Sequence, residues 1–172
     1  MRKIILVAVF AFISVVVKAQ EEVNWLTFEE AIEKNKENPK PILVDLYTDW
    51  CGWCKKMDKT TYKNEVIVKY INDNYYAVKM DGEGKEDITF KGKTYKFVQQ
   101  GRSKYHELAA AILKGKMSYP STAFFTPKEQ LIQAVPGYLD EKKFEKILAY
   151  FAKDNYKKTK WQKFSKNFKG TI

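Results

Sequence analysis

The sequence predicts an α/β fold in which helices flank a central mixed β-sheet, and three observations support this prediction. Residues 42–47 and 75–80 form short apolar runs, the first of them nearly unbroken, as in a strand that is covered on both faces. Amphipathic helical segments alternate with these two runs. Residues 121–125 and 131–134 are two further strand-like runs separated by a short turn, which indicates an antiparallel pair at one edge of the sheet.

The first helix and the first strand follow from local signals. Thr27 and Glu30 have the spacing of a capping box, in which a hydroxyl and a carboxylate three residues later cap the same helix start. We predict a helix from this point to about Asn38. The strand at residues 42–47 comes next, and Asp45 is an anomaly in it because a carboxylate stands there among apolar side chains.

A helix that breaks and restarts is predicted next. Residues 55–58 continue a helix that begins near Cys51, and residues 60–62 interrupt it. Asn64 is placed to cap a second segment, because apolar side chains recur at helical spacing over residues 66–71. The strand at residues 75–80 then returns the chain to the sheet.

An insertion is predicted between residues 81 and 116. Residues 88–90 and 94–98 flank Gly92 as the two arms of a hairpin. Residues 103–113 are predicted to be helical, with apolar side chains on one side at Leu108, Ala109, Ile112 and Leu113.

A last helix is predicted after the antiparallel pair of strands. Pro136 and Gly137 break the chain, and Asp140 is placed to cap the helix that follows. Its apolar side is formed by Phe144, Ile147, Leu148 and Phe151.

The N-terminus has the pattern of a secretory signal. Basic residues at positions 2 and 3 precede a fourteen-residue apolar run, residues 4–17, and Ala19 is placed as the residue before cleavage. The run is shorter than the roughly 18 to 20 residues that cross a bilayer as a helix. We therefore expect a signal peptide over residues 1–19, one domain over residues 20–152, and export, to the periplasm.

The C-terminal tail, residues 153–172, is basic and aromatic. Seven lysines face one aspartate between Lys153 and Lys169, and Trp161, Phe164 and Phe168 recur at helical spacing. We expect a helix whose aromatic side docks on the domain and whose lysines are solvated. Weak contact with an anionic membrane surface is the alternative. The formal net charge of +10 reflects general basicity and not a dedicated nucleic-acid site, so we expect no nucleic-acid partner. We also expect a monomeric protein.

The chain has only two cysteines, and they stand in the motif Cys51-Gly52-Trp53-Cys54. A disulfide across a two-residue gap closes a very small loop and adds little stability, so reversible redox use is favoured over a structural role. A thiol at a helix start meets free backbone N–H groups that lower its pKa. With two cysteines and one histidine, His106, a zinc site is not expected, and no cofactor is expected.

Taken together, these motifs resemble the thioredoxin superfamily, and more narrowly its exported thioredoxin-like members in which the redox helix breaks and restarts. The resemblance covers about residues 43–152. It is carried by residues 45–54, the segment Tyr119-Pro120-Ser121-Thr122, and the Pro136-Gly137 break before the last helix. It implies the thioredoxin fold, with the hairpin and helix inserted before a cis-proline.

The resemblance also implies roles for four residues. Cys51 is the exposed nucleophile that attacks a substrate disulfide, and Cys54 resolves the mixed disulfide that forms. Asp45 matches the buried acid that accepts the proton of the resolving thiol, and burial should raise its pKa. Lys79 matches a lysine that pairs with this acid; an ordinary exposed strand lysine is the alternative.

Five further residues are expected to bind the substrate. Pro120 matches the cis-proline beside the cysteines, and Tyr119 departs from the smaller residue expected before it, which could narrow access. Gly52 and Trp53 lie between the cysteines, and Trp53 replaces the proline of thioredoxins. Trp50, just before the motif, and Trp53, within it, are expected to form an apolar docking surface.

The predicted function is a thiol-disulfide oxidoreductase that exchanges disulfides with exported proteins, in the reductive direction, and passes electrons to or from a partner protein. One alternative is a thioredoxin-fold scaffold that binds peptides without redox turnover. Another is a membrane-surface adaptor that works through the basic tail.

Overall fold

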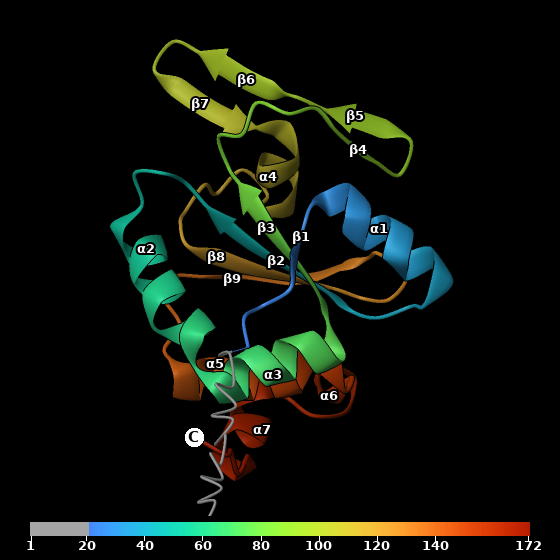
Figure 1. Ribbon diagram of the computed structural model, residues 1–172, viewed down its shortest axis with the longest axis vertical. Coiled ribbons are helices and arrows are strands. Elements are labelled where there is room, and N and C mark those ends of the chain that lie inside the picture. Colours follow the sequence, from blue (N-terminus) through green and yellow to red (C-terminus); the bar gives the residue numbers. More distant parts are fainter. Residues whose placement is uncertain (1–20) are drawn as a thin grey trace, which may run out of the picture.

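A computed structural model describes residues 21–172 and shows an α/β fold built on one mixed sheet (Figure 1). The predicted signal peptide, residues 1–19, lies outside the described residues. The strand order is β1-β3-β2-β8-β9; β1 and β2 both pair with β3 in parallel, and β8 pairs antiparallel with its two neighbours, β2 and β9. The five strands are β1 (Trp25–Leu26), β2 (Ile42–Tyr47), β3 (Tyr76–Asp81), β8 (Ser121–Phe125) and β9 (Leu131–Pro136). The predicted fold class is confirmed.

Helices cover both faces of this sheet (Figure 1). On one side lie α1 (Phe28–Glu37) and α4 (Glu107–Ile112), and on the other lie α2 (Gly52–Lys59), the short 3-10 helix η1 (Thr61–Lys63), α3 (Glu65–Asn74) and α5 (Glu141–Ala152). The tail adds α6 (Asn155–Lys158) and α7 (Trp161–Asn167).

The side chains of β2 point alternately to the two faces of the sheet, and each face has its own hydrophobic cluster. Ile42, Val44 and Leu46 pack against α1 and α4, whereas Leu43 packs against α3 and α5. Because side chains alternate along a strand, Asp45 points to the same side as Leu43, toward the face that α2 covers. The register places Asp45 directly beside Lys79 on β3 and Thr122 on β8.

The local helix signals are confirmed. Thr27 and Glu30 form the complete capping box of α1. The helix break is also present, because α2 ends at Lys59, η1 follows, and the side chain of Asn64 accepts hydrogen bonds from two N–H groups of α3. Strand β1 was not predicted, since two residues are too few to show a strand pattern.

The insertion differs from the prediction. It contains two hairpins, β4 (Ile88–Phe90) with β5 (Lys93–Tyr95) and β6 (Phe97–Gln100) with β7 (Ser103–His106), which lie together at one end of the molecule (Figure 1). The predicted arm at residues 94–98 is therefore wrong, because it spans the end of one hairpin and the start of the next.

The predicted helix at residues 103–113 is wrong for its first four residues. Gly101, at φ +60°, lies in the connection between β6 and β7, and cross-strand pairing with β6 holds residues 103–106 extended. Helix α4 starts after His106, whose Nδ1 accepts the N–H of Leu108. His106 is thus a buried helix cap and not a residue within the helix.

The tail forms two short helices where one was expected. Asp154 adopts a left-handed conformation at φ +54° before α6, and Thr159 is extended after it. Trp161 and Phe164 of α7 contact the Tyr150 ring at centroid distances of 5.2 and 5.0 Å. The buried Glu145 accepts hydrogen bonds from the backbone N–H groups of Thr171 and Ile172. The aromatic side of the tail therefore packs on α5.

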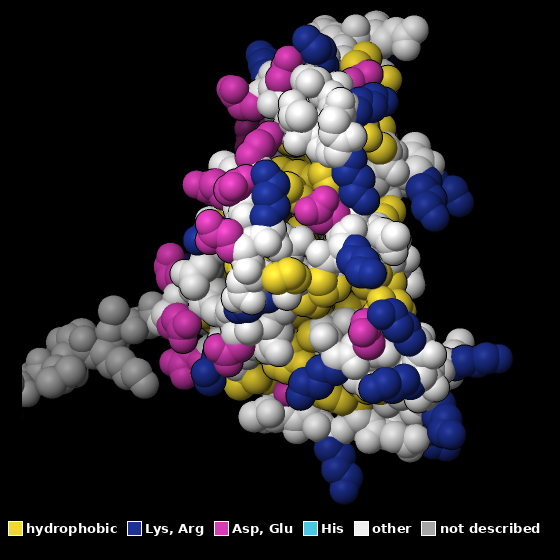
Figure 2. All heavy atoms as spheres, turned by 90° about the vertical axis from the view of Figure 1, so that its right-hand side faces the viewer, with side chains coloured by type: hydrophobic (Ala, Val, Ile, Leu, Met, Phe, Trp, Pro, Cys, Tyr) yellow, Lys and Arg dark blue, Asp and Glu magenta, His cyan; other side chains and the backbone are white. Residues whose placement is uncertain are grey.

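Charged side chains are mixed over the face seen in Figure 2, where acidic groups gather toward one edge and lysine and arginine are scattered over the rest. The lysine and arginine side chains therefore form no continuous basic stripe on this face. Within residues 21–172, no helix combines the length and apolar character needed to cross a membrane.

Candidate functional site

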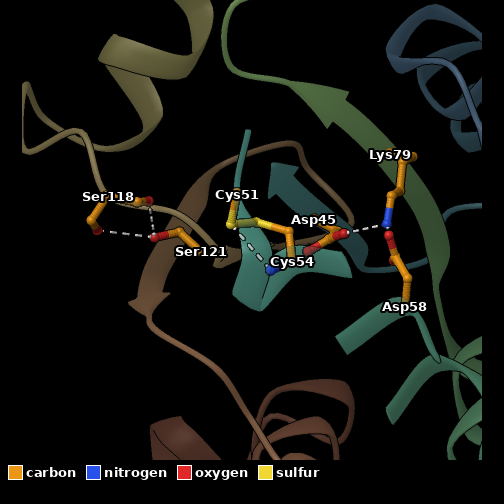
Figure 3. Close-up of a disulfide and its surroundings, with 7 residues drawn as sticks. All are labelled: Asp45, Cys51, Cys54, Asp58, Lys79, Ser118 and Ser121. Atoms are coloured by element: carbon orange, nitrogen blue, oxygen red, sulfur yellow. Dashed lines mark hydrogen bonds and ion pairs between the residues drawn. A yellow bond between two sulfur atoms is a disulfide. The ribbon is translucent and has the colours of Figure 1, made fainter. Parts of the chain in front are cut away.

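The two cysteines lie at the start of α2 and are joined by a disulfide (Figure 3). Cys51 is the N-cap of the helix, and its Sγ accepts a hydrogen bond from the backbone N–H of Cys54 at 3.1 Å. Free N–H groups and the helix dipole at this position stabilise a negative sulfur. The geometry therefore favours a Cys51 thiolate once the disulfide opens.

The expectation that Cys51 is exposed is wrong for this disulfide form of the protein. Cys51 is 4% exposed and Cys54 is 3% exposed, so both are buried. The bonded sulfur of Cys54 and the backbone N–H of the same residue both lie against the sulfur of Cys51. Large exposed surface is found instead on Trp50 and Trp53, at 67% and 58%.

Asp45 lies under the helix that carries the cysteines. Figure 3 shows its carboxylate between Cys54 and Lys79, and the side chain is buried. Its Oδ2 forms an ion pair with the Lys79 ammonium at 2.8 Å. Burial raises the pKa of Asp45, and the positive charge of Lys79 offsets part of this rise. The arrangement places a carboxyl group with a raised pKa next to Cys54.

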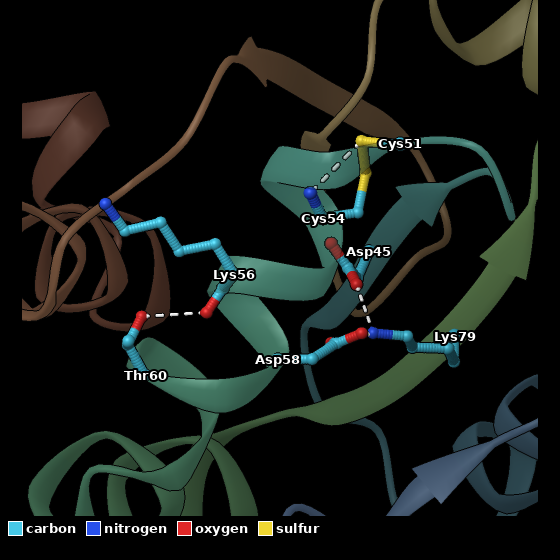
Figure 4. A network of polar contacts seen from close by, with 7 residues as sticks. All are labelled: Asp45, Cys51, Cys54, Lys56, Asp58, Thr60 and Lys79. Atoms are coloured by element: carbon cyan, nitrogen blue, oxygen red, sulfur yellow. Dashed lines mark hydrogen bonds and ion pairs between the residues drawn. A yellow bond between two sulfur atoms is a disulfide. The ribbon is translucent and has the colours of Figure 1, made fainter.

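Lys79 is partly buried and doubly paired. It forms ion pairs with both Asp45 and Asp58, which Figure 4 shows on either side of its ammonium group. Its ammonium also lies 5.0 to 5.3 Å from the ring centres of Trp25, Tyr47 and Tyr62. Although burial works against the charge, the two carboxylates raise the pKa of Lys79, so the lysine stays cationic.

Sequence reasoning missed Asp58. This residue comes four positions after Cys54 on α2, and residues at this spacing share one face of a helix. That spacing was the signal that could have placed Asp58 beside Lys79. On the adjoining turn, the Thr60 hydroxyl donates a hydrogen bond to the carbonyl of Lys56, which closes α2 (Figure 4).

Aromatic side chains surround the motif on both sides. The indole N–H of Trp50 donates to Glu83 at 3.0 Å, and its ring meets Tyr119 edge-on at 6.0 Å. Trp53 lies 5.5 Å from Tyr138, and the ammonium of Lys56 lies over both rings.

The remaining residues that were predicted to bind substrate are Tyr119, Pro120 and Gly52. The Tyr119–Pro120 peptide bond is cis. A side chain on Gly82, in the loop after β3, would collide with the Tyr119 ring, so this glycine allows Tyr119 to pack there. Burial, with Glu83 and Asp81, raises the pKa of Tyr119 to about 12. Gly52 is exposed, and a side chain there would meet nothing within 4 Å.

No cluster of three or more potential ligands among histidine, cysteine, aspartate and glutamate could hold a metal ion within residues 21–172.

The buried carboxyl group of Asp45 should make stability depend on pH. A carboxyl group whose pKa is higher in the folded than in the unfolded state binds its proton more tightly when folded. It therefore contributes stability below the unfolded pKa of about 3.9 that is lost as the pH rises through the folded pKa. Relative to Asp45→Asn, the free energy of unfolding of the oxidised wild type should fall with rising pH, by at most about 1.4 kcal/mol per pH unit.

Urea unfolding of both oxidised proteins from pH 4 to 9 measures this difference. Asp73→Asn, at an exposed ion pair with Lys69, is the matched control, and its difference from wild type should stay nearly flat. A wild-type minus Asp45→Asn difference that rises with pH would contradict the account of Asp45.

The sheet order, the flanking helices and the cysteine pair at a helix start define a thioredoxin-fold protein. The family model described as Thioredox_DsbH, a protein of unknown function (DUF255), matches residues 13–169. The chain belongs to this family.

Solved structures support the fold. A thioredoxin-fold protein from Helicobacter pylori is similar over 75% of this chain and 84% of its own, with a TM-score of 0.57 and 17% identity. A thioredoxin from Thermus thermophilus is similar over 74% of this chain and 85% of its own, with a TM-score of 0.55 and 14% identity.

Curated relatives match shorter segments. An uncharacterized protein of Caenorhabditis elegans, B0495.5, is 29% identical over 63% of this chain, and spermatogenesis-associated protein 20 of Mus musculus is 32% identical over 41%. The thiol:disulfide interchange protein DsbD of Campylobacter jejuni is 35% identical over 31%. The chain spans only 13%, 9% and 9% of the lengths of these proteins.

Proposed function

We propose that this protein is an exported thiol-disulfide oxidoreductase that reduces disulfides of other exported proteins through Cys51 and Cys54. The observation that carries the proposal is the buried Asp45 carboxylate beside Cys54, held by Lys79. A purely structural disulfide never opens, so a proton acceptor such as Asp45 beside it would have no chemical role. A resolving thiol, in contrast, must lose its proton before it can react.

The reaction starts from the dithiol form. The Cys51 thiolate attacks one sulfur of a substrate disulfide, a bond forms between these two sulfurs, and the other substrate sulfur leaves as a thiolate that takes up a proton. The thiol of Cys54 then gives its proton to Asp45. The Cys54 thiolate attacks the sulfur of Cys51, which closes the protein disulfide and releases the second substrate thiolate. Two electrons have passed from the protein to the substrate.

The reductive direction and the partners are part of this proposal. A base beside Cys54 speeds the step that frees a reduced substrate, which suits a reductase. Regeneration of the dithiol needs two electrons from a partner protein with its own dithiol, and no bound cofactor takes part. We propose that the protein is a monomer. We also propose that it acts in the periplasm, because the N-terminal pattern is that of a signal peptide.

A second candidate function is favoured by the burial of both sulfurs. A disulfide that is 4% and 3% exposed could be inert, and the exposed Trp50 and Trp53 would then grip an extended peptide without redox turnover. This scaffold differs from the enzyme in one decisive respect, because its activity would not need a reactive Cys51.

Reduction of insulin by dithiothreitol tests the proposal, with precipitation of the free insulin chain as the readout. Wild type should accelerate the reaction, and Cys51→Ser should return it to the rate of dithiothreitol alone. A wild type that gives no acceleration, together with peptide binding that survives in Cys51→Ser, would reject the enzyme in favour of the scaffold.

A further inference from the structure

Asp45 has a neighbour on each side in the sheet. Lys79 on β3 and Thr122 on β8 are its direct register partners, so the three side chains stand in a row on the face covered by α2 and η1. Lys79 holds Oδ2 of the carboxylate at 2.8 Å. Oδ1 remains for the proton of Cys54, and a carboxylate fixed at one oxygen alone can still rotate about its bond to Cβ.

Three buried oxygens of this part of the site have no hydrogen bond of ordinary geometry: Asp45 Oδ1, the Tyr62 hydroxyl and the Thr122 hydroxyl. All three residues are buried. The Tyr62 hydroxyl nevertheless lies close enough to interact electrostatically with both the Asp45 carboxylate and the Thr122 hydroxyl. Buried polar groups seldom stay unpaired without a reason, and here one of them is Oδ1, the carboxylate oxygen that the ion pair with Lys79 does not use.

The Tyr62 ring cannot swing away from this position. It meets Trp25 edge-on at 4.9 Å and Phe144 edge-on at 5.7 Å, and the Lys79 ammonium lies over it at 5.3 Å. The hydroxyl hydrogen is the part that can move. A hydroxyl both donates and accepts, so it can donate to the ionised carboxylate and accept from the protonated one.

We propose that Tyr62 and Thr122 are positioning residues, whose hydroxyls hold Oδ1 of Asp45 in place to take the Cys54 proton and stabilise the carboxylate before the transfer. This inference rests on the proposed function and adds two residues to it. The two hydroxyls do not touch the substrate, and they act through Asp45.

The pKa of Asp45 sets the pH dependence of the resolving step, and it depends on all the charged or titratable groups around this carboxylate. These groups are Lys79 on β3, Asp58 and Cys54 on α2, Tyr62 on η1 and Tyr47 on β2. Burial and the nearby Asp45 raise the pKa of Tyr62 well above its usual range, so its hydroxyl remains a neutral donor. Loss of a donor makes the Asp45 carboxylate less stable, so the pKa of Asp45 should rise further.

The test is the rate of the resolving step in a single turnover. Reduced protein in excess is mixed with a small aromatic disulfide whose second thiol absorbs light when it is released, at each pH from 5 to 9. For Tyr62→Phe, the pH at which the rate of release of the second thiol is half-maximal should move upward. At pH values below the wild-type midpoint, this rate should fall by about tenfold for each pH unit by which the midpoint moves. Thr122→Val should shift the midpoint in the same direction, and Thr122→Ser, which keeps the hydroxyl, should restore it.

Tyr70→Phe is the matched control, because the Tyr70 hydroxyl is also buried without a hydrogen-bond partner but lies on α3. It should leave the midpoint unchanged. Folded Tyr62→Phe and Thr122→Val proteins with the wild-type midpoint would overturn the inference while leaving the proposed function intact. If Tyr62→Phe fails to fold, the comparison of Thr122→Val with Thr122→Ser decides. A wild type without turnover would instead reject the proposed function itself.

Discussion

Cys54→Ser protein should stop at a covalent complex with its substrate. Cys51 keeps its place at the start of α2, so its thiolate can still open a substrate disulfide. A serine hydroxyl cannot then attack the new bond, and the mixed disulfide should persist. Turnover should fall by at least about a hundredfold, since resolution must wait for external thiol.

Non-reducing electrophoresis and intact mass measure the complex after incubation with insulin and quenching by an alkylating agent. The paired control is Cys51→Ser, in which the remaining Cys54 lies within the first turn of α2, without the N-cap position that favours a thiolate at Cys51, and should give little adduct. Equal adduct from the two variants would contradict the assignment of Cys51 as the nucleophile, and so would adduct from Cys51→Ser alone.

Phe124→Ala should cause the largest loss of stability, about 3 to 5 kcal/mol. Phe124 is fully buried on β8, two residues after Thr122, and lies on the same face of the sheet. Its ring stacks on Phe151 of α5 at 4.3 Å and lies 6.0 Å from Tyr75. Truncation would remove a large buried contact between β8 and α5 and leave a cavity there.

Urea unfolding of the oxidised protein measures the change, as a lower midpoint with an unchanged dependence on urea concentration. Phe168→Ala is the matched control, because Phe168 is half-buried in the tail and its ring contact is with Phe164 at 5.4 Å. It should cost about 1 kcal/mol or less. A loss for Phe124→Ala no larger than that of Phe168→Ala would show that this half of the core does not depend on Phe124.

Most of the fold could be predicted wherever the signal is local. The capping box at Thr27 and Glu30, the apolar strand 42–47 and the Asn64 cap each act within a few residues, and all are present. The errors lie in the insertion. Residues 103–106 carry a pattern that fits a helix start, and only pairing with residues 97–100 makes them a strand. Such pairing is a tertiary contact that overrides local preference.

The site was predictable where it follows the motif and not where it depends on distant elements. The pair Asp45 and Lys79 could be expected from the resemblance to thioredoxins, and the structure joins them at 2.8 Å. Asp58, Tyr62 and Thr122 come from α2, η1 and β8. Asp58 could have been found from its spacing to Cys54, but the convergence of Tyr62 and Thr122 on Asp45 depends on the turn after α2 and on strand register, neither of which can be read from residue order alone.

The reduction potential of the Cys51–Cys54 pair tests the central claim most directly. Alkylation of free thiols across glutathione and dithiothreitol buffers, with the modified fraction counted by mass, gives this potential. We predict reversible two-electron equilibration near the roughly −270 mV of thioredoxin. A value near about −120 mV would reverse the proposed direction, and a disulfide that equilibrates with no buffer would contradict the redox function altogether.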